Sequence, residues 1–175
     1  NRMRLPLAVF ESCRRKFPKH KPMSVRISAT DWAAGGLSGD DLMALTRLLK
    51  AAGCDLIDCS SGQTVPQQRP VYGRMYQAPY ADWVRNEVGI ATMTVGAVTS
   101  ADQVNTLLAS GKADLVALAR PHLANPYFTL QASAWYQHEA QFWPLQYLPG
   151  KEQALRNAPR ERDDRTELRL RARPA

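Results

Sequence analysis

Two segments of the sequence end an apolar run with groups that could hold an anion. Residues 115–119 lead straight into Arg120, whose guanidinium is a planar fork of N–H donors with a permanent positive charge. Residues 90–95 lead into Gly96, which lets a ligand come close to backbone N–H groups because it has no side chain. Donors of these two kinds are typical of a phosphate site if the fold brings the two segments together.

Both arginines of interest also have a purely structural interpretation. Arg120 could instead form an ion pair with a nearby Asp or Glu. Arg26 stands among apolar neighbours in the run SVRIS, where strand alternation could point it into a ligand site. An arginine in such surroundings needs an anionic or strongly polar partner, so a salt bridge and a ligand contact both remain open.

The elements that must position these residues alternate between helix and strand. Helical spacing is present at 2–17, 38–53, 79–88, 101–111 and 126–137, and strand-like runs at 23–28, 55–61, 90–96 and 114–119. Ser38 and Ser100 are suitable N-caps, and Gly53 stands where a C-terminal glycine belongs. Apolar strands that alternate with helices are typical of a parallel sheet.

An internal repeat supports this order of elements. KAAGCDLIDCS and LASGKADLVALA share one plan: a helix end, a glycine, a short link, Asp-Leu and an apolar strand. We interpret the repeated Asp55 and Asp114 as turn residues rather than catalytic ones. The unit fits half of a (β/α)8 barrel better than a doubly wound sheet, since no G-x-G-x-x-G follows any strand.

We therefore predict an α/β fold over residues 1–150, the C-terminal half of a (β/α)8 barrel with strands 5–8 and their helices. Phosphate is commonly bound after strands 7 and 8 of such barrels, which here end near Gly96 and Arg120. Four strands leave two unpaired edges. We expect the chain to be a piece of a longer protein, with the N-terminal half of the barrel as its partner. The charged residues 151–175 predict a disordered tail.

Charge and cysteine content exclude some classes of protein. The net charge is +7, but the basic residues gather at 13–21 and after residue 150, which argues against a nucleic-acid footprint. No apolar run reaches membrane-spanning length and no signal peptide is recognisable, so we expect no membrane partner. Three cysteines without a C-x-x-C pair indicate reduced thiols and a cytoplasmic location.

Five segments together resemble the second half of the old yellow enzyme family, FMN-dependent NAD(P)H oxidoreductases on a (β/α)8 barrel. These segments are NRMRLPLAVFESCRRKF, PMSVRISATDW, AGCDLIDCSSG, VGAVTS and ADLVALARPHLANPYF. A narrower resemblance is carried by QTVP, PVYGRMYQAPYADWVRNE and AWYQHEAQFWPLQYLPGKEQ. It is to the C-terminal reductase part of bifunctional salicylyl-CoA 5-hydroxylases and anthraniloyl-CoA monooxygenases, where an FAD monooxygenase domain comes first.

The resemblance implies FMN as the cofactor and five residues that bind it. Arg26 matches the family arginine at the N1–C2=O edge of the flavin, where a fixed cation stabilises the reduced ring. Gly96 and Ala97, with Ala119 and Arg120, match the backbone and guanidinium groups at the phosphate. Relatives often have glycine where Ala119 stands, a departure that still permits backbone donation.

The loop after residues 55–61 should border the substrate side of the flavin. The substrate-binding candidates are Ser61, Gln63, Arg74 and Tyr76, with Ser60 and Tyr72 beside them. A CoA thioester or a nicotinamide phosphate could bind Arg74, although an exposed loop arginine without such a role is the alternative. His122 could reach the phosphate through water or lie on the surface.

The resemblance implies hydride transfer from NADH or NADPH through FMN to an activated C=C bond or a dearomatised ring, which an aryl-CoA could carry. The family's proton-donating pair and tyrosine have no counterpart here, so we predict no catalytic residue in the chain. Tyr147 is kept, but Pro149 replaces an arginine that crosses between subunits in one branch, which leaves a homo-oligomer open. A phosphate-binding barrel aldolase or isomerase and a non-catalytic fragment are the alternatives.

Overall fold

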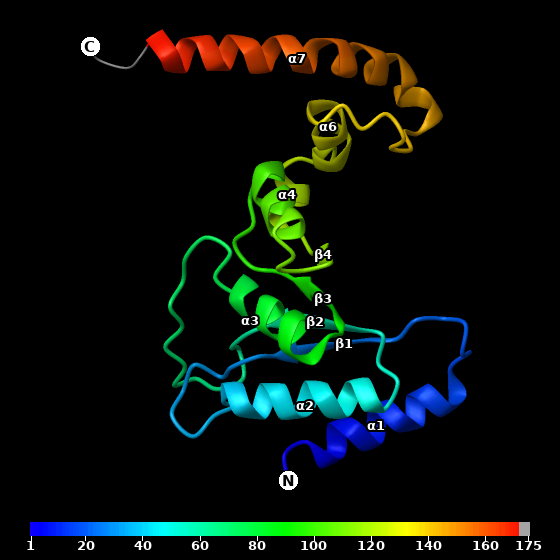
Figure 1. The fold of residues 1–175 in the computed structure, drawn as a ribbon, viewed down its shortest axis with the longest axis vertical. Helices are drawn as coiled ribbons and strands as arrows, with labels where there is room; N and C mark the ends of the chain where they lie inside the picture. Colours follow the sequence, from blue (N-terminus) through cyan, green and yellow to red (C-terminus); the bar gives the residue numbers. More distant parts are fainter. Residues whose placement is uncertain (172–175) are drawn as a thin grey trace. The chain divides into compact units, whose positions relative to one another are not determined.

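The fold is given by a computed structural model that describes the backbone of residues 1–171 and the side chains of residues 1–164. The chain divides into two compact units, Asn1–Leu118 and Ala119–Ala175 (Figure 1).

The first unit is a parallel sheet with a helix after each of its first three strands. Its strands are β1 (Ser24–Ser28), β2 (Leu56–Ser60), β3 (Ala91–Thr94) and β4 (Leu115–Val116). Its helices are α1 (Arg4–Lys16), α2 (Gly39–Ala51), α3 (Ala78–Trp83) and α4 (Ala101–Ala109), and a π-helical turn η1 (Val84–Val88) follows α3. The strand order is β1-β2-β3-β4, so each strand pairs with its neighbour in the sequence.

Side-chain alternation separates the two faces of this sheet. Ile27 and Ile57 are buried in one core with Phe10 of α1, Leu42 of α2 and Val84 of η1, so these helices cover one face. The other face carries a row of register partners, Arg26, Asp58, Met93 and Leu115, and we call this the inner face. A parallel sheet with its helices on one face is what half a barrel requires, which confirms the predicted fold class.

The ends of two helices follow the capping residues that the sequence indicated. The hydroxyl of Ser38 accepts from the N–H of Asp41 at 3.1 Å, and the Asp41 carboxylate accepts from the N–H of Ser38 at 3.0 Å, forming a capping box at α2. Ser100 caps α4 by accepting from the N–H of Gln103. Gly53 follows α2 with φ +89°, a conformation that favours glycine.

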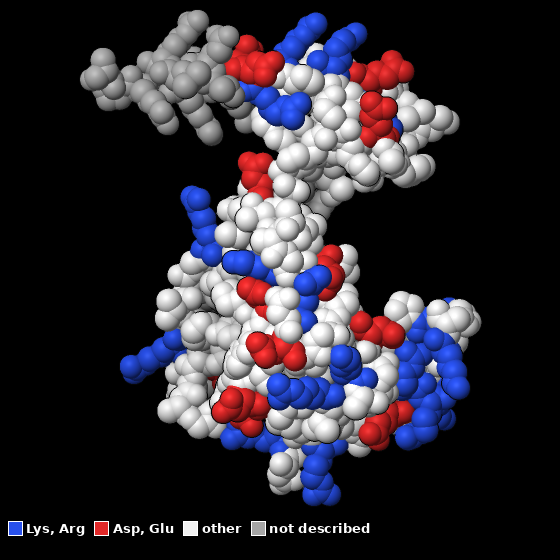
Figure 2. All heavy atoms as spheres, in the orientation of Figure 1, with Lys and Arg blue, Asp and Glu red and all other residues white. Residues whose placement is uncertain are grey.

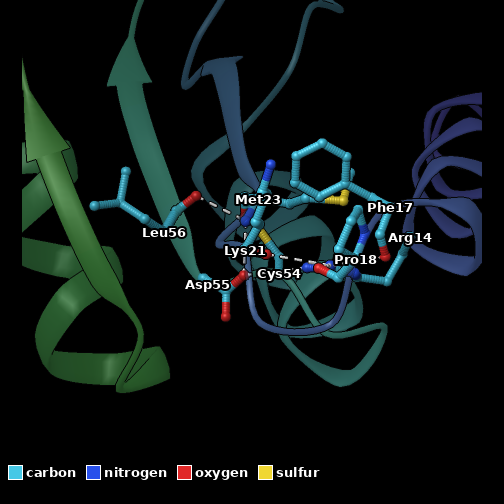
Figure 3. Close-up of polar contacts among 8 residues, drawn as sticks. All are labelled: Arg14, Phe17, Pro18, Lys21, Met23, Cys54, Asp55 and Leu56. Carbon is cyan, nitrogen blue, oxygen red and sulfur yellow. Dashed lines mark hydrogen bonds and ion pairs between the residues drawn. The ribbon is translucent and has the colours of Figure 1, made fainter.

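The repeated aspartates join neighbouring strands at their amino ends. The carboxylate of Asp55 accepts from the N–H of Met23 at 2.7 Å and lies 3.4 Å from Arg14 (Figure 3). Asp114 repeats this arrangement: it accepts from the N–H of Thr92 at 2.9 Å and pairs with Arg85 at 3.1 Å. Both residues therefore have the turn role that the repeat predicted.

The second unit is helical, and the structure differs from the prediction just before its start and along its last helix. It contains α5 (Arg120–Ala124), α6 (Phe128–Trp135), a 3-10 turn η2 (Leu145–Tyr147) and α7 (Leu148–Arg171). The predicted strand 114–119 is shorter, because it ends at Val116 and α5 begins soon afterwards. Where the composition indicated a disordered tail from residue 151, α7 continues to Arg171, and residues 172–175 lie outside the described residues.

Contacts with α6 explain why part of this charged segment is helical. Ala158 of α7 is buried, and the guanidinium of Arg162 lies 5.8 Å from the centre of the Trp135 ring. The Gln137 side chain also donates to the backbone oxygen of Leu155. Composition alone did not reveal that Trp135 and its neighbours offer α7 a surface on which to pack.

The surface shows charges of both signs. Figure 2 shows Lys and Arg side chains interspersed with Asp and Glu over the face drawn, with a group of basic side chains near the link from α1 to β1. In the part of the chain that the structure describes, no helix is both long enough and apolar enough to cross a bilayer.

Candidate flavin site

Arg26 is held on the inner face by a carboxylate of the next strand. Arg26 of β1 is the register partner of Asp58 of β2, and its Nε donates to Asp58 Oδ2 at 2.7 Å. The Asp58 side chain is 9% exposed, whereas that of Arg26 is 57% exposed. The salt bridge that the sequence left open therefore exists. The two Nη groups of Arg26 have no partner among the described residues, so a ligand contact is still available.

The turn after β3 has the backbone form that a phosphate site needs. Gly96 has φ +108° and Ala97 has φ +51°. A Cβ atom at Gly96 would overlap the Gln77 side-chain amide and lie 3.0 Å from Tyr76 Cε1. Among the described residues, the N–H groups of Gly96 and Ala97 have no acceptor. Two adjacent unengaged N–H groups can donate to an oxyanion, so this turn fits the phosphate of FMN.

A chain of hydrogen bonds connects the loops that follow β1, β2 and β3. Trp32 Nε1 donates to Ser61 Oγ at 3.0 Å, and Ser61 Oγ donates to Gln77 Oε1 at 2.7 Å. Gln77 Nε2 then donates to the backbone oxygen of Val95 at 2.8 Å, next to Gly96. Gln77 is only 3% exposed, so burial adds to the cost of breaking this chain.

Gln77 was not among the residues predicted for the site. Residues 32, 61, 77 and 95 are too far apart in the sequence for any local pattern to connect them. The only available signal was a polar side chain directly before the helix that starts at Ala78.

Unfavourable backbone conformations gather in the same loops. Four residues other than glycine have positive φ in the first unit: Trp32 at 53°, Gln63 at 64°, Met75 at 56° and Ala97 at 51°. All four lie in the loops that follow strands β1, β2 and β3. Such conformations persist where the surroundings enforce them, which is common at ligand sites.

The substrate candidates have different environments. Ser61 is buried, and its only hydroxyl proton is committed to Gln77. Gln63 and Arg74 are exposed, and Arg74 has no partner among the described residues. Tyr76 packs beside Gly96 and meets the ring of Tyr72 edge-on, with the ring centres 5.3 Å apart. Tyr76 is therefore the candidate that the structure brings nearest to the Gly96 turn.

Ala119 and Arg120 belong to the second unit, at the start of α5. Arg120 is exposed, and it has no ion pair with any described carboxylate of its own unit. His122 Nε2 lies 3.5 Å from Thr129 Oγ1, and its ring contacts that of Phe128. Because Gly96 lies in the other unit, its pairing with Arg120 around one phosphate stays a prediction.

The thiols of the two buried cysteines are poor nucleophiles. Burial raises the pKa of the Cys59 thiol to about 12, with a smaller contribution from the Asp58 charge. Burial also raises the pKa of Cys54, whose thiol donates to the backbone oxygen of Leu56. Within the described residues, no three His, Cys, Asp or Glu side chains are grouped so that they could hold a metal ion.

Known proteins with similar sequences include bacterial NADPH dehydrogenases. The NADPH dehydrogenase of Halalkalibacterium halodurans is 46% identical over 112 residues, which are 64% of this chain and 33% of the relative. The NADPH dehydrogenase of Listeria innocua is 42% identical over the same shares of the two chains. This chain thus spans about a third of the length of the curated relatives that it matches.

Solved structures and a family model agree with the fold. A complex of 2-naphthoyl-CoA reductase with 2-naphthoyl-CoA superposes with a TM-score of 0.63 at 20% identity. The superposition covers 72% of this chain and 20% of that one, and at this identity it shows a shared fold only. The model of the NADH:flavin oxidoreductase / NADH oxidase family matches residues 1–139. This chain therefore belongs to that family, also called the old yellow enzyme family.

Proposed function

We propose that this chain supplies the C-terminal half of the FMN site in an oxidoreductase that uses NADH or NADPH. The observation that supports this proposal best is the position and hydrogen bonding of Arg26. It stands on the inner face of a half-barrel, fixed through Nε, with both Nη groups unengaged among the described residues. A fixed cation with free donors suits the edge of a flavin ring that gains negative charge on reduction.

The phosphate of FMN would bind at the turn after β3. The unengaged N–H groups of Gly96 and Ala97 are the donors on this side. Ala119 would add a backbone donor and Arg120 a bidentate guanidinium, because Arg120 is not committed to a carboxylate of its own unit. The hydrogen bonds of Gln77 hold the Gly96 turn in place before any ligand arrives.

When bound, FMN accepts hydride from NADH or NADPH and passes it to a second substrate. We propose an activated C=C bond or a dearomatised ring as the acceptor, with an aryl-CoA as a member of this class. The relatives named NADPH dehydrogenase favour NADPH as the reductant. The narrower resemblance to reductase parts of bifunctional aryl-CoA enzymes supports the CoA thioester. Proton donors would come from the other half of the barrel.

The test is FMN retention by a protein that joins this chain to the upstream half of a barrel. The purified protein should be yellow, which separates this function from a phosphate-binding aldolase or isomerase. Arg120→Ala should weaken FMN retention about tenfold or more, because a charge-assisted bidentate contact is lost. Arg15→Ala, at an exposed arginine of α1, is the matched control. Equal retention by the two variants would contradict the phosphate role of Arg120.

A further inference from the structure

We infer that Asp58 is a positioning residue for the flavin site. It aims the free edge of the Arg26 guanidinium at the ligand, and its negative charge opposes excessive stabilisation of the reduced flavin. The inference rests on the proposed function, since it concerns what Arg26 presents to FMN.

The Asp58 carboxylate is hydrogen-bonded through only one of its two oxygens among the described residues. Oδ2 accepts from Arg26 Nε at 2.7 Å, but Oδ1 is buried and has no hydrogen-bond partner among the described residues. A buried carboxylate oxygen without a donor costs stability. If the pair only stabilised the sheet, a better-satisfied polar pair or an apolar pair would do so at lower cost. This suggests that the Asp58 carboxylate serves to orient the Arg26 guanidinium and not only to stabilise the sheet.

Asp58 leaves most of the Arg26 donors free. A guanidinium carries one Nε–H and four Nη–H donors in a rigid plane. Because Asp58 takes the Nε–H, the side chain is fixed while the Nη donors stay unengaged among the described residues. The register pairing of β1 with β2 holds both residues on rigid strands, so the direction of the fork is set before ligand binding.

Asp58 also acts on the flavin site through its negative charge. Asp58 is nine-tenths buried, so its charge is screened less than that of a surface carboxylate. It therefore offsets part of the positive field that Arg26 projects from the inner face. Removing the charge while keeping the hydrogen bond should strengthen that field and favour the reduced, more negative form of FMN.

Asp58→Asn makes this change, because the amide oxygen can still accept from Arg26 Nε. In the FMN-loaded protein, we expect reduced FMN to gain about tenfold in affinity relative to oxidised FMN, which raises the two-electron potential by about 30 mV. Asp40→Asn, at an exposed residue in the first turn of α2, removes the same charge elsewhere and should leave the potential unchanged. Equal potentials in Asp58→Asn and the unsubstituted protein would overturn the electrostatic part.

Two further measurements keep the inference testable if Asp58→Asn folds poorly. In the protein that joins this chain to the upstream half of a barrel, freed of FMN, the Nε–H proton of Arg26 should exchange slowly with solvent by NMR, and Asp58→Ala should speed this exchange. Arg26→Lys keeps the charge and the pairing but has no fork, and it should weaken binding of oxidised FMN about tenfold. Unchanged exchange in Asp58→Ala, or unchanged affinity in Arg26→Lys, would overturn the positioning role. A barrel that binds no FMN at all would instead defeat the proposed function.

Discussion

At Gly96, backbone conformation and packing both exclude a side chain. Its φ of +108° is strained for any residue with a Cβ, and that atom would overlap the Gln77 amide. We expect Gly96→Ala to cost about 1–3 kcal/mol of stability and to reduce FMN retention, because either the turn or Gln77 must move. Thermal unfolding and FMN titration measure the two effects. Gly73→Ala is the control, since a Cβ there meets no atom within 4 Å.

If Gly96→Ala and Gly73→Ala retain FMN equally well, the turn after β3 does not hold the phosphate. A Gly96→Ala variant that loses stability but retains FMN would lead to the same conclusion about the phosphate. In that case the close approach of Gln77 would serve only the folding of the loops.

The three thiols should differ in reactivity for a reason visible at the residue scale. Cys13 is exposed, whereas Cys54 and Cys59 are buried and have raised pKa values, that of Cys59 reaching about 12. A raised pKa keeps the thiol protonated at neutral pH, and the thiolate is the nucleophile. Iodoacetamide should therefore modify Cys13 alone in the folded chain and all three thiols after unfolding. Mass spectrometry counts the adducts, and rapid modification of Cys59 in the folded chain would contradict its burial.

Single residues were predictable from the sequence where the chain itself marks them. Arg26 is conspicuous within SVRIS, and Gly96 follows a strand. The partner of Arg26 could not be chosen beforehand, because Asp58 lies 32 positions away and only the β1–β2 register brings them together. Gln77 was missed for the same reason: it contacts Ser61 and Val95 through tertiary structure alone.

At the scale of one element, the start of α2 should respond to acid. Hydrogen bonds from the backbone and then the side chain of Ser38 lower the pKa of Asp41 below its usual 3.8. A lowered pKa means that the ionised carboxylate stabilises the folded state. This contribution is present above pH 3.8 and is lost as the pH falls through the lower folded value.

Asp41→Asn should therefore destabilise the chain at neutral pH and become equal to the unsubstituted chain well below pH 3.8. Denaturant unfolding at both pH values measures the difference. Ser38→Ala removes the cap itself and should cost about 1 kcal/mol at neutral pH. A destabilisation by Asp41→Asn that persists in acid would show that the charge of the capping box is not its cause.

Elements with local end signals were predicted well, and those fixed by packing were not. Ser38, Gly53 and Ser100 marked helix ends that the structure confirms. The predicted helix 79–88 also ends at such a signal, since Gly89 follows it with φ +67°, but nothing in the sequence indicated that its second half, Val84–Val88, is π-helical. Helix α7 was not predicted from its charged composition. The burial of Val84 and Val88 depends on α2 and the sheet, and α7 depends on its contacts with α6.

On the scale of the whole molecule, the first unit has the incomplete surfaces of half a barrel. Strands β1 and β4 are the edges of the described sheet, and each leaves one side of its backbone unpaired. The inner face exposes Leu115 by 51% beside the partly buried Met93. A closed barrel would pair both edges and cover this row, and the curated relatives are about three times as long as the matched segment.

We therefore expect the 175-residue chain, expressed alone, to self-associate and to retain little FMN. Joining it to the part of the Halalkalibacterium halodurans NADPH dehydrogenase that precedes the matched segment should give a monodisperse, yellow protein, because the two halves pair each other's edges. Size-exclusion chromatography with visible absorbance measures both properties, and the relative's N-terminal part alone is the control. A monomeric isolated chain that binds FMN as well as the joined protein does would contradict this prediction. Its edge strands and inner face would then be stable without an N-terminal half to cover them.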